Sequence, residues 1–284
     1  MFVILGGTGH IGSALAERLL GRGERVTIVS HDEGKRATWE ARGADVALAD
    51  VRDVPALRRA LARGARAFLL NPPADPSSDT AKAELETAHA IAEAVRGAGL
   101  ARTVVESTYG AQPGAALGDL GVLYQLERLL RGADSAVSVI RGAYYMSNWD
   151  ASIPLARSEG RLLSLYPANF LLPMVAPRDI AQVADALLTA DDARPGPTYV
   201  EGPERYTPAD VAEALASVLR RSVEVETIPE PQWEPFLRQA GFSPAAARSM
   251  AAMTRATLEN PELPAAPVRG ATSLRRYLAG RLES

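Results

Sequence analysis

The chain contains no cysteine, which excludes disulfide bridges, cysteine-ligated zinc and thiol catalysis, and which fits a reducing cytoplasm. Histidine is scarce. The chain has only His10, His31 and His89, and their spacing matches no metal-binding motif. No apolar run approaches the roughly 18–20 residues that span a bilayer, and the apolar start of the chain lacks the basic segment of a signal peptide. We therefore expect a cytoplasmic protein with no metal site and no membrane contact.

An excess of positive charge is also missing. The net charge is −3 and the sequence pI is about 5.8, so we expect no nucleic-acid partner. Apolar residues make up 47% of the chain and charged residues 23%, which is ordinary for a globular protein. A length of 284 residues allows one large domain, or a main domain with a smaller appendage. We expect a small-molecule substrate, and both a monomer and a homodimer stay open.

Short apolar strands alternate with longer helices through the first part of the chain. The expected strands are residues 2–5, 26–29, 44–49, 67–70, 103–106 and 136–140. This alternation predicts a parallel sheet covered by helices on both faces, and right-handed crossovers make such a sheet doubly wound. The predicted fold class is therefore α/β, a doubly wound parallel sheet of the Rossmann type.

The second half of the chain is richer in proline and less regular. Helices are expected near residues 178–188, 208–219, 231–240, 243–258 and 273–282, with an edge strand at 223–228. Thr207 followed by Pro208 is typical of a helix start. We expect a Rossmann domain over residues 1–150 and a smaller, mainly helical C-terminal lobe over residues 151–284. Within that lobe, residues from about 175 to 200 should pack back on the Rossmann sheet.

Three glycines mark the turn between the first strand and the first helix. Gly6, Gly9 and Gly12 form a GxxGxxG pattern: the first permits a tight turn, the second lets a pyrophosphate approach the backbone, and the third lets the helix pack closely. The free N–H groups at the helix start would bind the diphosphate. A glycine turn without a ligand is the alternative, but the order of strand, loop, helix and strand favours a nicotinamide dinucleotide. Further expected cofactor contacts in this loop are Thr8, His10 and Ile11.

The end of the second strand indicates which dinucleotide binds. An acid there would hydrogen-bond the ribose of NAD and repel the 2′-phosphate of NADP. The sequence instead has Ser30 and His31 at this place, with Lys35 and Arg36 close behind. We therefore favour NADPH over NADH. Asp32 weakens that preference, unless it caps the helix that follows.

Asp50 ends the third strand, with Val51 beside it. In a fold of this kind, a polar side chain at that place hydrogen-bonds the adenine of the cofactor. The alternative is that Asp50 caps the helix that begins near Val54. Both interpretations stay open from the sequence.

These motifs resemble the NmrA-like group of atypical short-chain dehydrogenases/reductases over most of the chain. The matching segments are the Gly6–Gly12 loop, the turn Asn71-Pro72-Pro73, the segment Glu106-Ser107-Thr108-Tyr109-Gly110, Glu127, and residues 139–149. The resemblance implies NAD(P) binding, with Asn71, Pro72 and Pro73 near the cofactor. It also implies reduction of quinones, azo or triphenylmethane dyes or phenylpropanoids, or else a cofactor-binding regulator with little turnover.

The chain departs from the Tyr-x-x-x-Lys pair of such enzymes. Counting back from Glu127, the lysine position falls on Leu123 and the tyrosine position on Asp119, and neither side chain can do the chemistry of that pair. Tyr124 and Arg128 stand four residues apart and imitate the pair, one residue out of register. Tyr124 is therefore one candidate acid, with arginine lowering the phenol pKa electrostatically but relaying protons poorly.

Other polar and aromatic residues follow the fifth and sixth strands. Tyr109, with Ser107 beside it, is the stronger candidate for a polar group near the nicotinamide, because ligands bind at the carboxyl ends of such strands. The alternative is that Tyr109 packs against Trp149 or the lobe. The residues expected to line the substrate cleft are Tyr144, Tyr145, Asn148 and Trp149, of which one or two could belong to the core.

The sequence favours an NADPH-dependent reductase that transfers hydride to a conjugated small molecule, such as a quinone, enone, azo compound or imine. Such an acceptor needs orientation more than a strong acid, because charge delocalises and water can supply the proton. The rival hypothesis is an NAD(P)-sensing regulator without turnover, which the absent Tyr/Lys pair supports. An isomerase or cyclase without net hydride transfer is a third. No GxSxG elbow and no P-loop lysine occur.

Overall fold

A parallel sheet forms the centre of the main body in the computed structural model, which describes residues 1–190 and 196–283. Within that part of the chain the strand order is β3-β2-β1-β4-β5-β6-β10-β13, and every neighbouring pair is parallel. The strands are β1 (Phe2–Leu5), β2 (Val26–Ser30), β3 (Asp45–Leu48), β4 (Arg66–Leu69), β5 (Arg102–Thr108), β6 (Ala136–Gly142), β10 (Pro197–Glu201) and β13 (Val268–Arg269). β1 and β2 are buried along their whole length, as expected of a sheet covered on both sides.

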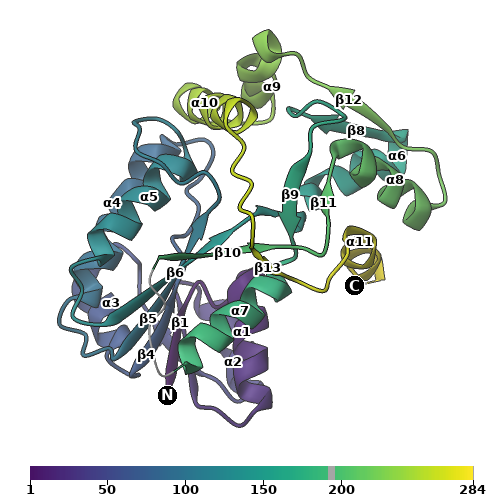
Figure 1. Cartoon of the computed structure of the whole chain (residues 1–284). Coiled ribbons are helices and arrows are strands. Elements are labelled where there is room, and N and C mark those ends of the chain that lie inside the picture. The colour runs from purple at the N-terminus through teal and green to yellow at the C-terminus, as the bar shows by residue number, and fades with distance from the viewer. Residues whose placement is uncertain (191–195, 284) are drawn as a thin grey trace.

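Helices cover both faces of this sheet (Figure 1). One face carries α1 (His10–Gly21), α2 (Arg36–Ala41) and α7 (Pro177–Thr189), and the other carries α3 (Val54–Leu61), α4 (Thr80–Val95) and α5 (Asp119–Leu130). A short 3₁₀ helix, η1 (Glu33–Lys35), precedes α2. The predicted fold class, a doubly wound α/β sheet of the Rossmann type, is confirmed.

The lobe beyond β6 has its own hydrophobic core, which includes Met146, Trp149 and Met174. Its helical elements are η2 (Met146–Ser152), α6 (Ile153–Glu159), α8 (Pro208–Leu219), η3 (Glu230–Gln232), α9 (Trp233–Gln239), α10 (Pro244–Glu259) and α11 (Leu274–Glu283). Two small sheets accompany them: β11 (Arg205–Tyr206), β9 (Leu172–Val175) and β7 (Tyr144–Tyr145) form one, and β12 (Glu224–Thr227) and β8 (Arg161–Ser164) the other. The lobe is thus mainly helical, as predicted, although of these strands only the one near 223–228 was expected.

Local signals place the helix starts. Thr207 accepts a hydrogen bond from the backbone of Asp210 and the Asp210 carboxylate accepts one from the Thr207 backbone, which makes a capping box at the start of α8. Asp53 caps α3 and Asp79 caps α4 in the simpler one-sided way. The predicted helix start at Thr207 is therefore confirmed.

Segments far along the chain return to the main sheet. α7 packs against α1, β10 pairs with β6, and β13 pairs with β10. Residues 191–195 of the segment that was expected to pack back lie outside the described residues. The division into domains at residue 150 stays a prediction.

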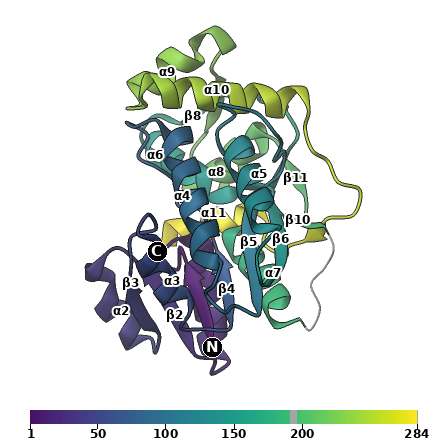
Figure 2. The same cartoon turned by 90° about the vertical axis from the view of Figure 1, so that its left-hand side faces the viewer.

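α10 lies across the ends of α4 and α5 and joins the lobe to the main body (Figure 2). Ser243 at its start bonds the loop before α4, through its N–H to the Pro76 carbonyl (2.8 Å) and its hydroxyl to the Ser78 carbonyl. The Ser249 hydroxyl accepts a bond from the N–H of Gly118, just before α5, at 3.0 Å. α10 therefore forms a roof over the carboxyl edge of the sheet. None of the described helices is both long and apolar enough to cross a membrane.

Candidate active site

The glycine loop after β1 is built for a close backbone approach. Gly6 has φ +79°, a conformation that favours glycine. A Cβ added at Gly12 would lie 2.3 Å from the Gly6 carbonyl oxygen, so only glycine lets α1 begin this close to the loop. A Cβ at Gly9 would meet only that same oxygen, at 3.5 Å, so the space in front of Gly9 is open.

The start of α1 leaves its N–H groups available. Gly9 is the N-cap, no side chain caps the helix, and no acid lies in its first turn. Ile11 is buried in the core and offers only its backbone, whereas Thr8 is half-buried and His10 is exposed. An uncapped helix start facing open space is a suitable site for an anion. The residues of the loop therefore fit the diphosphate of a dinucleotide.

Several polar groups after β2 are already engaged with one another. The Ser30 hydroxyl accepts a hydrogen bond from the Asp32 N–H at 3.0 Å, and the Asp32 carboxylate accepts one from the Gly34 N–H at 2.9 Å. Asp32 thus caps η1, which was the alternative interpretation of this residue. Arg36 is held by two glutamates, Glu33 and Glu40.

His31 and Lys35 are the remaining polar candidates for a 2′-phosphate at this edge. Both side chains are exposed, and no ion pair involves Lys35 within residues 1–190 and 196–283. A lysine ammonium is a common phosphate ligand because it is a mobile point charge with three donors. Of the predicted phosphate contacts, these two are the ones free to turn toward a ligand.

Asp50 lies at the same edge, next to Val51, which is half-buried. Its carboxylate accepts bonds from the backbone N–H and the guanidinium of Arg52, and these bonds lower the pKa of Asp50. Asp53 rather than Asp50 caps α3, so the capping interpretation of Asp50 is wrong. The role of Asp50 at the adenine stays a prediction.

The turn after β4 is fixed by side-chain hydrogen bonds. The Asn71 amide donates to the Glu84 carbonyl at 3.0 Å, and its oxygen accepts from the Thr87 hydroxyl at 2.8 Å. These bonds tie the Asn71-Pro72-Pro73 turn to α4. Asn71 and Pro73 face a cavity, with Pro72 between them.

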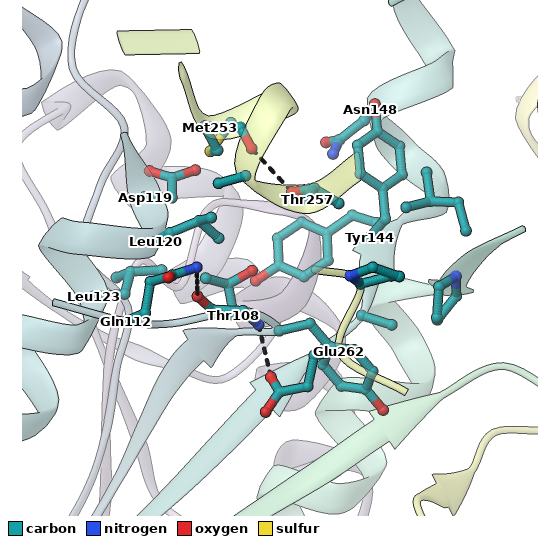
Figure 3. Close-up of a pocket in the computed structure, with 18 of the residues that line it drawn as sticks. Thr108, Gln112, Asp119, Leu120, Leu123, Tyr144, Asn148, Met253, Thr257 and Glu262 are labelled. Carbon is teal, nitrogen blue, oxygen red and sulfur yellow. Dashed lines mark hydrogen bonds between the residues drawn. The ribbon is translucent and has the colours of Figure 1, made fainter. Parts of the chain in front are cut away.

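That cavity has a volume of about 330 Å³ and lies between the carboxyl ends of β4, β5 and β6 and the roof formed by α10. Its walls are mostly apolar and aromatic, with a few polar groups. In Figure 3, Tyr144 and Asn148 lie across the cavity from Leu120 and Leu123, and Met253 and Thr257 of α10 close it from above. Such a space suits a flat small molecule.

Successive side chains of β5 point to opposite faces of the sheet, so adjacent residues of this strand differ in role. Glu106 and Thr108 line the cavity. Ser107 points to the other face, where its hydroxyl donates to the Glu127 carboxylate at 2.5 Å, and Arg141 holds the same carboxylate through two bonds. Contrary to expectation, the structure therefore does not bring Ser107 to the cavity. Thr108 lies in the position that we expected for Ser107.

Tyr109 does line the cavity, but its hydroxyl is engaged. It donates to the buried Glu201 carboxylate at 3.2 Å, and burial together with the charge of Glu201 raises the pKa of Tyr109 well above its ordinary value. Its ring packs edge-on against Tyr199 at 5.3 Å, not against Trp149. A less acidic phenol bound to a carboxylate is a poor proton donor. Tyr124, the other candidate acid, is half-buried on α5 and does not line the cavity.

The aromatic segment after β6 divides between cavity and core. Tyr144, Tyr145 and Asn148 line the cavity, as expected. Trp149 is only 4% exposed, belongs to the lobe core and packs against the Tyr144 ring at 5.8 Å. Trp149 is therefore a core residue, which was the alternative interpretation for at least one member of this group.

Four carboxyl groups line the cavity and were not singled out as site residues from the sequence: Glu84, Glu106, Asp119 and Glu262. Glu106 is 2% exposed, and burial raises its pKa well above the ordinary value; it accepts a hydrogen bond from the Tyr145 hydroxyl at 3.0 Å. Glu84 and Asp119 lie on α4 and α5 and line the cavity within electrostatic reach of each other. Among the described residues, no group of three or more histidine and carboxylate side chains is arranged to hold a metal ion.

Other residues missed from the sequence come from α10 and the segment after it. They are Met253, Ala256, Thr257, Asn260, Pro261 and Glu262. Glu262 accepts a bond from the Gly110 N–H at 2.6 Å and another from the Tyr199 hydroxyl, so it holds this segment against the cavity mouth. Nothing in the local sequence signals these contacts, because they form only when the lobe packs on the sheet.

Two of the similar curated proteins are named as reductases. The chain is 30% identical over 257 residues to the (4-alkanoyl-5-oxo-2,5-dihydrofuran-3-yl)methyl phosphate reductase of Streptomyces griseus, covering 84% of this chain and 86% of that protein. It is 24% identical to the NAD(P)H azoreductase of Xenophilus azovorans, covering 88% and 85%.

Solved structures share the fold. The triphenylmethane reductase of Citrobacter sp., in complex with NADP(H), superposes with a TM-score of 0.82 at 17% identity, covering 99% of this chain and all (100%) of that one. The NADPH-dependent quinone oxidoreductase of Escherichia coli gives 0.76 at 20% identity, with 100% of both chains covered. The model of the NmrA-like family matches residues 1–263. With the glycine loop, the Asn71 turn and the segments after β5 and β6 all within that match, the chain belongs to the NmrA-like family.

Proposed function

We propose that the protein is an NADPH-dependent reductase that transfers hydride to a conjugated small molecule of the quinone, enone, azo or imine type. One observation carries the proposal: the glycine loop and the cavity share a wall. A Cβ added at Gly6 would lie 3.2 Å from the Leu70 Cβ, and Leu70 lines the cavity. A dinucleotide bound on the loop would therefore reach the cavity with its nicotinamide end. The relatives named as reductases of a dihydrofuran phosphate and of azo compounds support the same reaction class.

Each part of the chain has a separate task in this reaction. The bound cofactor supplies the hydride. The N–H groups at the uncapped start of α1 would hold the diphosphate, and the exposed His31 and Lys35 would bind the 2′-phosphate. The roof of α10 excludes water, and the aromatic wall at Tyr144 orients a flat acceptor.

The direct test measures cofactor binding and turnover on the whole chain. We expect NADPH fluorescence to rise on binding, with weaker binding of NADH. NADPH absorbance should then fall when a quinone, an azo dye or an enone is added. Binding without consumption across this panel would support the sensing regulator instead. Binding of neither cofactor would overturn the proposal.

Lys35→Ala tests the preference for NADPH. Removing an exposed cation from a phosphate contact should raise the NADPH dissociation constant about five- to tenfold, or about 1 kcal/mol, and leave that of NADH unchanged. Lys82→Ala, an exposed lysine on α4, is the matched control and should change neither constant. Equal weakening of both cofactors by Lys35→Ala would show that Lys35 does not contact the 2′-phosphate.

A further inference from the structure

Glu84 and Asp119 face each other across the gap between α4 and α5. Their carboxyl groups lie within electrostatic reach of each other where α4 packs on α5, and both residues line the cavity. Glu84 is 7% exposed, and its Oε1 accepts the Ala74 N–H at 2.9 Å. Asp119 is the more exposed member, and in Figure 3 it lies on the cavity wall beside Leu120. The pair therefore has a buried member and a member that water and a ligand can reach.

Two neighbouring carboxyl groups in a cavity keep a proton to higher pH than a single one, because charging both brings two like charges close together. Burial, followed by the charge of Asp119, raises the pKa of Glu84 to about 7. Desolvation of its carboxyl group also raises the pKa of Asp119, although the residue as a whole is exposed. Near neutral pH the pair thus keeps a proton that an isolated glutamate would have lost.

Few other charged groups face the pair. Across the cavity stand the Tyr145 phenol and the Glu106 carboxyl, and the phenol lies within electrostatic reach of Asp119. The Glu262 carboxylate also lines the cavity, where it accepts bonds from the Gly110 N–H and the Tyr199 hydroxyl. From the roof, α10 presents Met253, Ala256 and Thr257, and the turn after β4 presents Asn71 and Pro73, none of which ionises. No described lysine or arginine lines this cavity to hold the pair as two carboxylates.

The other acids of the cavity are less suited to give a proton away. The Tyr109 phenol is bound to Glu201. Glu106 is almost fully buried, and one of its oxygens has no hydrogen-bond partner in the structure, so donation would leave an unpaired buried carboxylate. The Glu84–Asp119 pair avoids this cost, because Asp119 is accessible and the Ala74 N–H stabilises Glu84.

We propose that the Glu84–Asp119 pair supplies the proton that balances hydride transfer, a role that rests on the reductase function proposed above. With an enone, the β carbon gains a hydride from NADPH and the C=C π bond opens. An O–H bond of the pair breaks, and its proton passes to the α carbon or to the carbonyl oxygen. The products are the saturated ketone or its enol, NADP⁺ and a deprotonated pair, which regains its proton from water through Asp119.

The test compares an acceptor that needs a proton with one that does not. Cyclohexenone takes a hydride and a proton, whereas malachite green, a triarylmethyl cation, takes a hydride alone. Both rates are measured with saturating NADPH for the wild type, Glu84→Gln and Asp119→Asn. Glu86→Gln, which changes an exposed glutamate on the same helix, is the matched control. NADPH binding and thermal unfolding are measured for every variant.

We expect Glu84→Gln and Asp119→Asn to lower the ratio of the enone rate to the dye rate about 100-fold, as for loss of a general acid. The wild-type enone rate should fall as the pH rises through about 7, because the pair then loses its proton, and Glu84→Gln should lose this step. In the cofactor-free wild type, an infrared carboxylic-acid C=O band should disappear over the same pH range and be missing from Glu84→Gln.

The possible failures are distinct. An unchanged rate ratio in whichever variant folds, or a wild type that reduces the dye alone, would overturn the proton-donor role and leave the reductase standing. If the wild type reduces the enone alone, the rate ratio cannot be formed, and the proton-donor role is tested by the other two measurements. A pH profile or an infrared band that Glu84→Gln leaves unchanged would then overturn it. A wild type that binds NADPH but reduces neither acceptor would overturn the proposed function itself.

Discussion

Gly12→Ala is expected to raise the NADPH dissociation constant at least about 100-fold, a loss of about 2.7 kcal/mol. The new methyl group would lie 2.3 Å from the Gly6 carbonyl oxygen, 2.7 Å from the Gly6 carbonyl carbon and 2.8 Å from the Gly7 Cα. These are backbone atoms, which cannot rotate away as a side chain would. The start of α1 must therefore move away from the loop, and its N–H groups no longer point toward the diphosphate site.

Two further alanine variants separate this effect from a general loss of stability. Gly21 ends α1 with nothing within 4 Å of an added Cβ, so Gly21→Ala should bind NADPH like the wild type. The Cβ added by Gly9→Ala would meet only the Gly6 oxygen, at 3.5 Å, so this variant should fold normally. It should weaken NADPH binding only by crowding the phosphate. Fluorescence titration and thermal unfolding of all three would settle the matter. Wild-type affinity in a folded Gly12→Ala would contradict the assignment of the loop.

The sheet and its helices could be predicted because their signals are local. β1 is apolar along its length and β2 is mostly β-branched, and Asp79, Thr207 and Ser243 are polar caps directly before apolar helix patterns. The two-residue strands β7, β11 and β13 were beyond this reasoning. A segment that short has no period, and it becomes a strand only when its partner lies beside it.

The direction of the β5 side chains could not be read from the sequence. In a strand exposed on one face, alternating polarity shows which residues point outward, but both faces of β5 are covered by helices. Ser107 and Thr108 are therefore equivalent in pattern, and only the packing of β5 between α7 and α5 turns Thr108 toward the cavity.

Asp119 was set aside in the sequence because it cannot do the work of a tyrosine beside a lysine. The partner that changes its chemistry, Glu84, lies on a different helix and is brought to it only by the packing of α4 against α5. A single exposed acid on a helix has an ordinary pKa, whereas burial and a neighbouring acid inside a cavity raise it. The chemistry of this position is thus a property of the fold and not of a motif.

Glu127→Gln should lower the free energy of unfolding by about 3 kcal/mol, because it breaks a buried ion pair and leaves the other partner in place. Glu127 and Arg141 are 6% and 13% exposed and are joined by two short bonds, of 2.9 and 3.0 Å. The same carboxylate accepts the Ser107 hydroxyl, so the pair ties α5 to the carboxyl ends of β5 and β6. Urea denaturation followed by circular dichroism measures the loss.

Glu159→Gln is the matched control, because its ion pair with Arg161 is similarly short, at 2.8 Å, but is about half exposed on both sides. Exposed pairs contribute roughly 0–1 kcal/mol, so this variant should unfold close to the wild type. A loss of unfolding free energy in Glu127→Gln as small as that of the control would show that the buried pair does not stabilise the junction of α5 with β5 and β6. A large loss with NADPH affinity retained would assign Ser107, Glu127 and Arg141 to the support of the cavity floor, since none of the three faces the ligand space where Thr108 and Asp119 lie.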